Sequence, residues 1–268
     1  LECKLLMLAT HNIFSPANGK PIATPTQDIT LGVYYLTLPP KNPESARLFR
    51  DIHEVLFALD TGHIKIHDAV RIPNPDYGTD TPRGDKDSKV ILTTAGRCLF
   101  TGVWDKSLGF WNEMPKSDEN GKLTGGVAKK KEIGKLIAQA YEYIGHEKTI
   151  KLLDDLKNLG YEYATIAGFS ISISDMSVPK SKVDMIAAAR AEVDIINGQY
   201  SAGALTDGER HNKIVDVWTS TSNKVAETLF AESEEAHRKN INPVYSMLDS
   251  GALVSKDQIP QLAGMRGL

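Results

Sequence analysis

The stretch from Pro179 to Arg238, PKSKVDMIAAARAEVDIINGQYSAGALTDGERHNKIVDVWTSTSNKVAETLFAESEEAHR, predicts a long antiparallel helical hairpin. Apolar side chains recur there at steps of three, four or seven residues, which places them on one stripe of a helix. The stripe holds Val183, Ile186, Val193, Ile196 and Tyr200 on the first arm, and Ile214, Val217, Thr221, Val225 and Leu229 on the second. Because each arm is apolar along one face, we expect the arms to pack together as a coiled coil over about residues 180–238.

The hairpin turns at residues 201–209, SAGALTDGE. Gly203 is suited to end the first helix, since glycine tolerates the left-handed backbone that often follows a helix. Thr206 with Glu209 three residues later matches the capping box that begins a helix. Arms of roughly 20 and 30 residues, at about 1.5 Å rise per residue, project on the order of 30–45 Å. We do not expect an arm of that length to form the core of a 268-residue chain.

The composition is that of an ordinary soluble globular protein, with 41% apolar and 24% charged residues. A formal net charge of −3 lacks the basic surplus of a self-sufficient duplex-DNA binder, so any nucleic acid must be held elsewhere. Cys3 and Cys98 are far apart and form no CxxC pair, which fits a reducing cytosol. The sequence has no bilayer-spanning apolar run and no signal-peptide pattern. Its start at Leu1 without Met and its end at Leu268 predict a segment of a longer protein.

Outside the hairpin, residue periodicity predicts both helices and strands. Helices are expected at residues 2–10, 43–59, 130–144 and 147–159, and strands at residues 63–68 and 89–103. Residues 29–37 are compatible with a helix or a strand, and apolar and polar residues alternate briefly within residues 161–174. Gly145 is expected to separate two helices and Gly160 to stop the second. Residues 15–21 form a rigid turn-rich loop, residues 73–88 an exposed loop, and residues 106–131 a connector that marks a boundary. The predicted fold class is therefore α+β, with strands before the connector and mainly helices after it.

No complete catalytic constellation is present in the sequence. His63 and His67 are four residues apart, but the alternating pattern places them on one strand face with no carboxylate or cysteine cluster beside them. Gly121-Lys122 is followed by Leu123 rather than by Ser or Thr, so a flexible linker is favoured over a phosphate loop. Two alternatives stay open from the residues alone: a cytosolic coiled-coil binding or adaptor module without catalysis, and a hydrolase that uses the two histidines.

Eight motifs, in this order, resemble the bacterial RNA polymerase β′ subunit just downstream of that family's metal-binding aspartate loop. They are Leu5–Gly19 with SPANG at its end, Pro25–Asp28 with Leu31–Tyr35, Thr93–Arg97, Gly160–Thr165, Ala167–Ile171 with Asp175–Met176, Thr206–Arg210 with Asn212–Lys213, Asp249–Ala252, and Gln261–Leu268. They cover nearly the whole chain.

The resemblance implies a division into three regions. Residues 1–128 would form a strand-containing pore-like region, residues 129–243 a mainly helical funnel-like region that carries the coiled coil, and residues 244–268 the start of a cleft-like region. The resemblance also implies DNA-templated RNA synthesis in a cytoplasmic complex with β, α, ω and sigma subunits, template DNA and RNA. The family holds its Mg²⁺ in a motif like NADFDGD, which is absent here, so we expect no catalytic or metal-binding residue in this chain.

The resemblance further implies two sites along the secondary channel, which admits nucleoside triphosphates and receives the RNA 3′ end when the enzyme backtracks. Near the active centre, the amide side chains of Asn18 and Gln27 would orient a nucleotide or the RNA end by hydrogen bonds. Cleavage factors of the family enter the channel after docking on the coiled coil. Its partner site would consist of Thr206, Glu209, Arg210, Asn212 and Lys213. Without the resemblance, the same patch is an ordinary solvated first turn of a helix.

The chain departs from the family pattern near its C-terminal end. After Ser-Gly-Ala the family usually continues with Arg-Gly and later with Gln-Ile/Val-Arg-Gln-Leu, whereas Leu253, Val254 and Pro260 stand here. A proline inside a helix costs about 3 kcal/mol, so we expect residues 256–265 to bend or to begin their helix at Pro260. His211 stands where the family often has Tyr.

Overall fold

The computed structural model describes residues 1–40, 42–117 and 123–266, and these form two compact units. The first unit contains Leu1–Gly168 together with Ser250–Ala252, and the second contains Phe169–Asp249 together with the chain from Leu253 onward. The linker expected at Gly121-Lys122 lies outside the described residues.

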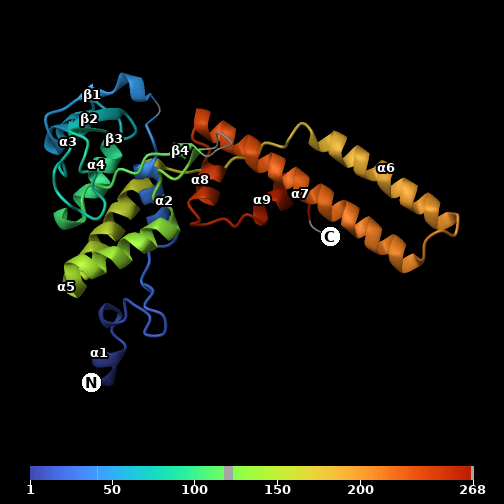
Figure 1. Ribbon diagram of the computed structural model, residues 1–268, viewed down its shortest axis with the longest axis horizontal. Coiled ribbons are helices and arrows are strands. Elements are labelled where there is room, and N and C mark those ends of the chain that lie inside the picture. Colours follow the sequence, from blue (N-terminus) through green and yellow to red (C-terminus); the bar gives the residue numbers. More distant parts are fainter. Residues whose placement is uncertain (41, 118–122, 267–268) are drawn as a thin grey trace. The chain divides into compact units, whose positions relative to one another are not determined.

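The first unit combines helices with a small sheet (Figure 1). Its helical elements are α1 (Glu2–Leu6), η1 (Ala9–His11), α2 (Gln27–Thr37), η2 (Pro43–Ser45), α3 (Ile52–Asp60), α4 (Ala95–Gly102), η3 (Lys106–Leu108) and α5 (Lys130–Ala167). Its strands are β1 (Arg47–Leu48), β2 (Ala69–Pro73), β3 (Val90–Thr94), β4 (Lys116–Ser117) and β5 (Leu123–Thr124). In the larger sheet β2 lies between β1, to which it is parallel, and β3, to which it is antiparallel. The register pairs Ala69 with Thr94 and Pro73 with Val90, whereas β4 and β5 pair only with each other.

The main core of the first unit forms where α2 packs against α5. Val33 on α2 is buried in one cluster with Ile133 and Leu156 on α5. The two helices approach closely because each has a glycine at the contact: a Cβ built on Gly32 would lie 1.9 Å from the carbonyl oxygen of Gly160. Only glycine, which has no Cβ, fits at this position.

A fully buried arginine joins the elements around this core. Arg97 lies in α4, and its guanidinium donates to the carbonyl oxygens of Thr37 at 3.2 Å and Gly126 at 2.6 Å. It also donates to Oδ1 of Asn112 at 3.3 Å. Burial lowers the pKa of Arg97 to about 10, and the carboxylate of Glu113 acts in the opposite direction. The side chain therefore stays charged at neutral pH and binds mainly to carbonyl groups.

The second unit is organised by the hairpin of α6 (Lys182–Ser201) and α7 (Asp207–Lys239), which run side by side in opposite directions (Figure 1). The remaining helical elements of this unit are η4 (Ile173–Asp175), α8 (Pro243–Asp249) and α9 (Gln258–Ala263). Buried side chains at the contact between the arms include Ile196 on α6 and Val225 on α7. The hairpin's base is closed by an apolar cluster that joins Leu229 to residues of α8 and α9.

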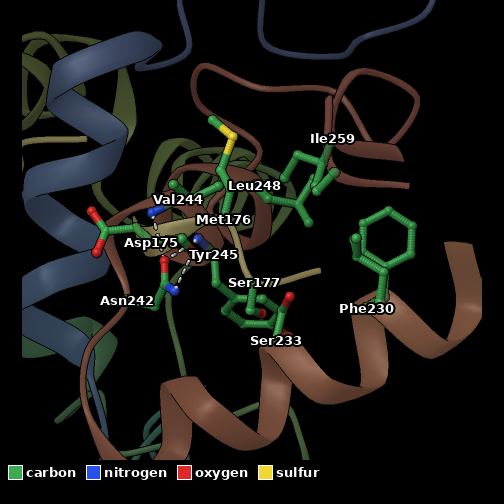
Figure 2. Close-up of a pocket in the computed structure, with 12 residues that line it drawn as sticks. Asp175, Met176, Ser177, Phe230, Ser233, Asn242, Val244, Tyr245, Leu248 and Ile259 are labelled. Carbon is green, nitrogen blue, oxygen red and sulfur yellow. Dashed lines mark hydrogen bonds between the residues drawn. The ribbon is translucent and has the colours of Figure 1, made fainter. Parts of the chain in front are cut away.

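Asn242 ties three segments together at that base (Figure 2). Its side-chain nitrogen donates to the carbonyl oxygen of Asp175 at 3.0 Å, and its Oδ1 accepts from the N–H groups of Val244 at 2.9 Å and Tyr245 at 3.2 Å. Its backbone N–H donates to Nδ1 of His237 at 3.1 Å. The Asn242 side chain thus caps α8. Through its other hydrogen bonds, Asn242 also connects the end of α7 with the segment that precedes α6.

The predicted α+β class and the antiparallel hairpin are confirmed. The backbone of Gly145 has φ of 77° and interrupts α5, as predicted. Gly203 follows α6 with φ of 76°, and residues 29–37 are helical rather than extended. The apolar stripe is only partly buried, because two packed helices hide just the line along which they touch: Ile196 is 7% exposed, whereas Val183 in the first turn of α6 is 73% exposed.

The strand predictions are wrong at two places. Residues 63–68 form turns, and the ring of His67 is held by a hydrogen bond at 2.8 Å to the carbonyl oxygen of Tyr35. The segment 89–103 is a strand only as far as Thr94. There the threonine hydroxyl accepts from the N–H of Arg97 at 3.3 Å and begins α4.

Three helix predictions also need correction. The helix expected at residues 43–59 begins at Ile52, because Asp51 caps it by accepting from the N–H of Glu54 at 2.8 Å. The helix expected at residues 2–10 ends at Leu6. Helix α5 runs past Gly160 to Ala167, so the alternation read over residues 161–174 is helical in its first half.

Helix α9 includes Pro260 at its third position, where a proline is tolerated because the first-turn N–H groups have no partner within a helix. The helix begins at Gln258 rather than at the proline. The predicted regions 1–128, 129–243 and 244–268 stay predictions, and residue 129 is the N-cap of α5.

We predict that Gly32→Ala lowers the free energy of unfolding by about 1–3 kcal/mol, since the added methyl group meets backbone atoms of α5 that cannot rotate away. Urea denaturation followed by tryptophan fluorescence measures this change. The matched control is Gly134→Ala, also a helical glycine, whose Cβ would meet nothing closer than 3.9 Å and should stabilise the helix by up to about 1 kcal/mol. Equal stability of the two variants would contradict the close contact.

We predict that Arg97→Lys destabilises the first unit by about 2–3 kcal/mol, because a single ammonium group cannot reach the carbonyls of both Thr37 and Gly126. The same denaturation experiment measures it. Arg71→Lys, on an exposed side chain of β2, serves as the control and should change stability by less than about 0.5 kcal/mol.

Candidate functional site

The candidate site is the tip of the α6–α7 hairpin, which lies at the end of both arms in Figure 1. Helix α6 ends at Ser201, and the chain reverses through Gly203, whose N–H donates to the carbonyl oxygen of Tyr200 at 2.9 Å. The N–H of Ala204 donates to the carbonyl oxygen of Gln199 at 3.0 Å. The chain thus reverses its direction between Ser201, the last residue of α6, and Asp207, the first residue of α7.

A reciprocal capping box begins α7, as predicted. The Thr206 hydroxyl accepts from the N–H of Glu209 at 3.4 Å, and the Glu209 carboxylate accepts from the N–H of Thr206 at 2.9 Å and from its hydroxyl at 2.8 Å. These hydrogen bonds, first that of the backbone N–H, lower the pKa of Glu209. Although both side chains are exposed, each is engaged in capping the start of α7.

Arg210 lies across the hairpin rather than pointing freely into solvent. Its guanidinium carbon is 4.4 Å from the centroid of the Tyr200 ring on the other arm, within the range of a cation–π contact. Its Nη2 donates to Oδ1 of Asp207 at 2.7 Å. The side chain is 34% exposed.

The other predicted docking residues, Asn212 and Lys213, are exposed and lie in the first two turns of α7. The Lys213 ammonium contributes to the lowered pKa of Glu209, which is one helical turn before it. His211 is exposed beside them. The structure therefore brings all five predicted docking residues together at one end of one helix.

The predicted channel residues lie in the first unit, before and at the start of α2. The SPANG loop closes through a bridge between Phe14 and Pro21, with Gly19 at φ of 64°. Oδ1 of Asn18 accepts from the N–H of Lys20 at 3.1 Å, which leaves the amide nitrogen of Asn18 available as a donor.

Gln27 is the first residue of α2 and has φ of 50°, a conformation that is uncommon for a residue other than glycine. Its side chain is exposed. Strained backbone of this kind is often retained where a side chain must point in a fixed direction. The role of Asn18 and Gln27 along the secondary channel stays a prediction.

The two histidines of the candidate pair have different surroundings, and Cys98 is buried. His67 is bonded to Tyr35, as described above, and His63 is exposed. Burial raises the pKa of the Cys98 thiol to about 12, so it is not a nucleophile at neutral pH. Across residues 1–40, 42–117 and 123–266, no three His, Cys, Asp or Glu side chains gather as a metal site, and no helix is long and apolar enough to cross a membrane.

A small pocket and a larger cleft, both formed by described residues, lie away from the tip. The pocket in Figure 2, between α7, α8 and α9, holds only about 10 Å³, roughly the volume that one water requires. A cleft of about 580 Å³ in the first unit lies beside β3, and Arg83 at its wall donates to Oε1 of Gln139 at 2.6 Å. Burial lowers the pKa of Arg83, while the carboxylates of Glu113 and Glu132 raise it. Neither hollow contains a predicted site residue.

Sequence reasoning missed the contact between Tyr200 and Arg210 at the site itself. The periodicity puts Tyr200 on the apolar stripe of the first arm, and the resemblance groups Arg210 with the docking residues. Tyr200 lies three residues before Gly203, and Arg210 lies four residues after Thr206. This near-symmetry about the turn is the signal in the sequence that indicates the contact. Pairing across an antiparallel hairpin follows from such spacing once the turn is located.

Fold and site together describe a helical-hairpin segment with a polar tip. Family models match two ranges of the chain. The model described as RNA polymerase Rpb1, domain 3, matches residues 12–176, and that of Rpb1, domain 4, matches residues 205–268. Since the first match covers more than half of the sequence, the chain belongs to the RNA polymerase Rpb1 family.

Individual relatives agree with this assignment. The chain is 47% identical to the DNA-directed RNA polymerase subunit β′ of Methylacidiphilum infernorum, 45% to that of Opitutus terrae and 41% to that of Aliarcobacter butzleri. Each alignment covers 100% of this chain but only 19%, 19% and 16% of the relative. The chain thus spans less than a fifth of the length of these β′ subunits and is similar to one segment of them.

We predict that Thr206→Ala weakens the start of α7 by about 1 kcal/mol, because the capping hydroxyl is lost. Amide hydrogen exchange at residues 207–209 should become faster. Thr219→Ala, an exposed position in the middle of the same helix, is the control and should leave this exchange unchanged.

We also predict that the cap is sensitive to acid. The pKa of Glu209 is lowered in the folded hairpin, so its contribution is present above the ordinary glutamate pKa and is lost as pH falls through the lowered value. An NMR titration of the Glu209 carboxyl carbon measures this pKa. In Thr206→Ala it should rise only part of the way, since the backbone N–H of residue 206 still donates. An unshifted titration in the unaltered protein would contradict the capping box.

Proposed function

We propose that this chain is the part of a bacterial RNA polymerase β′ subunit that lines the secondary channel and offers the α6–α7 hairpin as a docking arm. The observation that carries the proposal is that β′ subunits align with the whole chain, including the hairpin and its capped tip. A pair of helices that packs mainly along one line and carries a polar tip suits contact with another protein better than core formation.

The proposed activity is nucleotidyl transfer by the assembled polymerase, to which this chain would contribute binding and positioning. By the resemblance to the family, the Mg²⁺ that this chemistry requires would be held by aspartates outside the chain. Among the described residues, no three His, Cys, Asp or Glu side chains gather as a metal site. Asn18 and Gln27 would present amide groups to a nucleoside triphosphate or to the RNA 3′ end. Both are exposed, and the amide nitrogen of Asn18, for which no acceptor is found within the described part of the chain, supports this role.

The proposed partners are the β, α, ω and sigma subunits, with template DNA and RNA in the assembled enzyme, in the cytoplasm. Transcript-cleavage factors would dock on the hairpin tip and enter the channel. The exposed group of Thr206, Glu209, Asn212 and Lys213 supports such a surface. The net charge of −3 is consistent with nucleic acid being held mainly by other parts of the complex.

Intact mass and subunit composition of the native complex that contains this sequence test the proposal. Continuity with a much larger β′-like polypeptide beside β-like and α-like subunits would support it. Isolation of a 29.4 kDa chain alone or with one small partner would favour an independent coiled-coil adaptor instead.

We predict that replacing Asn212 and Lys213 together by Ala in the assembled polymerase weakens stimulation by a cleavage factor about tenfold more than it slows unassisted elongation. Both residues are exposed hydrogen-bond donors at the tip, and a few such contacts suffice for a tenfold effect. Factor-dependent RNA cleavage and single-round elongation are measured side by side. Lys224→Ala, an exposed lysine farther along α7, is the control. An equal loss in both assays would contradict docking at the tip.

A further inference from the structure

Resting on the proposed docking function, we infer that Arg210 is a positioning residue that, together with Tyr200, fixes the hairpin tip for its partner and does not itself bind the partner. The resemblance to the polymerase family groups Arg210 with the docking residues. Its contacts in the structure assign it to the hairpin's own architecture.

The first step is the contact between the arms. Tyr200 is in the last turn of α6 and Arg210 is in the first turn of α7, so their stack at 4.4 Å joins the two helices directly beside the turn. The ring supplies the negative face that attracts a guanidinium. Tyr200 is 38% exposed, so the stack is partly shielded from water.

The second step concerns the donors of the guanidinium. Of its N–H groups, those of Nη2 face Asp207 at 2.7 Å. The Nε of Arg210 is buried and, within the described part of the chain, meets no hydrogen-bond acceptor. One face of the group thus lies on the Tyr200 ring, one N–H of Nη2 is in an ion pair on the same helix, and Nε is buried. These contacts all lie within the hairpin, which assigns the side chain first to the hairpin's own architecture.

The third step is what the stack positions. Residues 201–204 are exposed and turn through a left-handed glycine, so they contribute little packing of their own. The capping box holds only the first turn of α7, whereas the stack links that turn to α6. It therefore sets the direction in which Asn212 and Lys213, one turn farther on, face the solvent.

The test uses the assembled polymerase and a purified bacterial transcript-cleavage factor, with affinity measured by fluorescence titration. Tyr200→Leu and Arg210→Ala should each weaken binding by the same factor, roughly five- to tenfold, and the double variant should bind no worse than either single variant. Tyr200→Phe keeps the ring face and should bind within about twofold of the unaltered protein. Asp194→Asn, an exposed position farther back on α6, is the matched control.

A second readout does not depend on the partner. Amide exchange at residues 203–208 should be faster in Tyr200→Leu and Arg210→Ala, and restored in Tyr200→Phe. Unchanged exchange in the first two variants would overturn the inference even if binding were weakened.

The outcomes separate this inference from the docking proposal. Weaker binding by Arg210→Ala with unaltered binding by Tyr200→Leu would show that the guanidinium contacts the partner, which overturns the inference and leaves docking intact. If Lys213→Ala weakened binding while Tyr200→Leu and Arg210→Ala did not, the docking proposal would stand and the positioning role of the stack would be overturned. Unaltered affinity in all of these variants would overturn the docking proposal itself.

Discussion

The first unit depends on one buried charge. Arg97 is removed from water, and the cost of burying it is met by carbonyl groups from the end of α2 and from the segment that leads into α5. The Thr37 hydroxyl reinforces the same junction by accepting from the N–H of Ala128 at 3.0 Å. Because these segments are fixed at their ends, Gly32 and Gly160 can be held in a contact that tolerates no side chain. A buried arginine and a glycine contact thus set the position of α2 on α5.

The second unit has little buried surface along its hairpin, since two packed helices can bury only one line of side chains. Its hairpin is therefore secured at its ends. Asn242 and the apolar cluster around Leu229 hold the base, and the capping box with the Tyr200–Arg210 stack holds the tip. Between these ends the polar surface is left free. Such an arm can present its tip to a partner without a large core behind it, which is why we place the docking site there.

Local patterns carried a large part of the prediction. The hairpin, the turn at Gly203, the capping box of Thr206 and Glu209 and the break at Gly145 all follow from residues within a few positions of one another, and all are present. The ordered motifs indicate the polymerase family, and the family-model match over residues 12–176 shows that family. The strand read at residues 63–68 failed because an alternating pattern over six residues is also compatible with turns that are held by distant contacts.

By itself, then, the sequence determined the hairpin, its caps and its family, because helix periodicity and capping are interactions between near neighbours along the chain. Only the tertiary structure decided that Gly160 packs against α2 instead of ending a helix, that Arg97 is a buried junction, and that Arg210 lies on Tyr200. Each of these depends on which distant segment comes to lie beside the residue. A glycine or an arginine has the same local signature whether it faces water or another helix, and the physical difference arises only when the chain has packed.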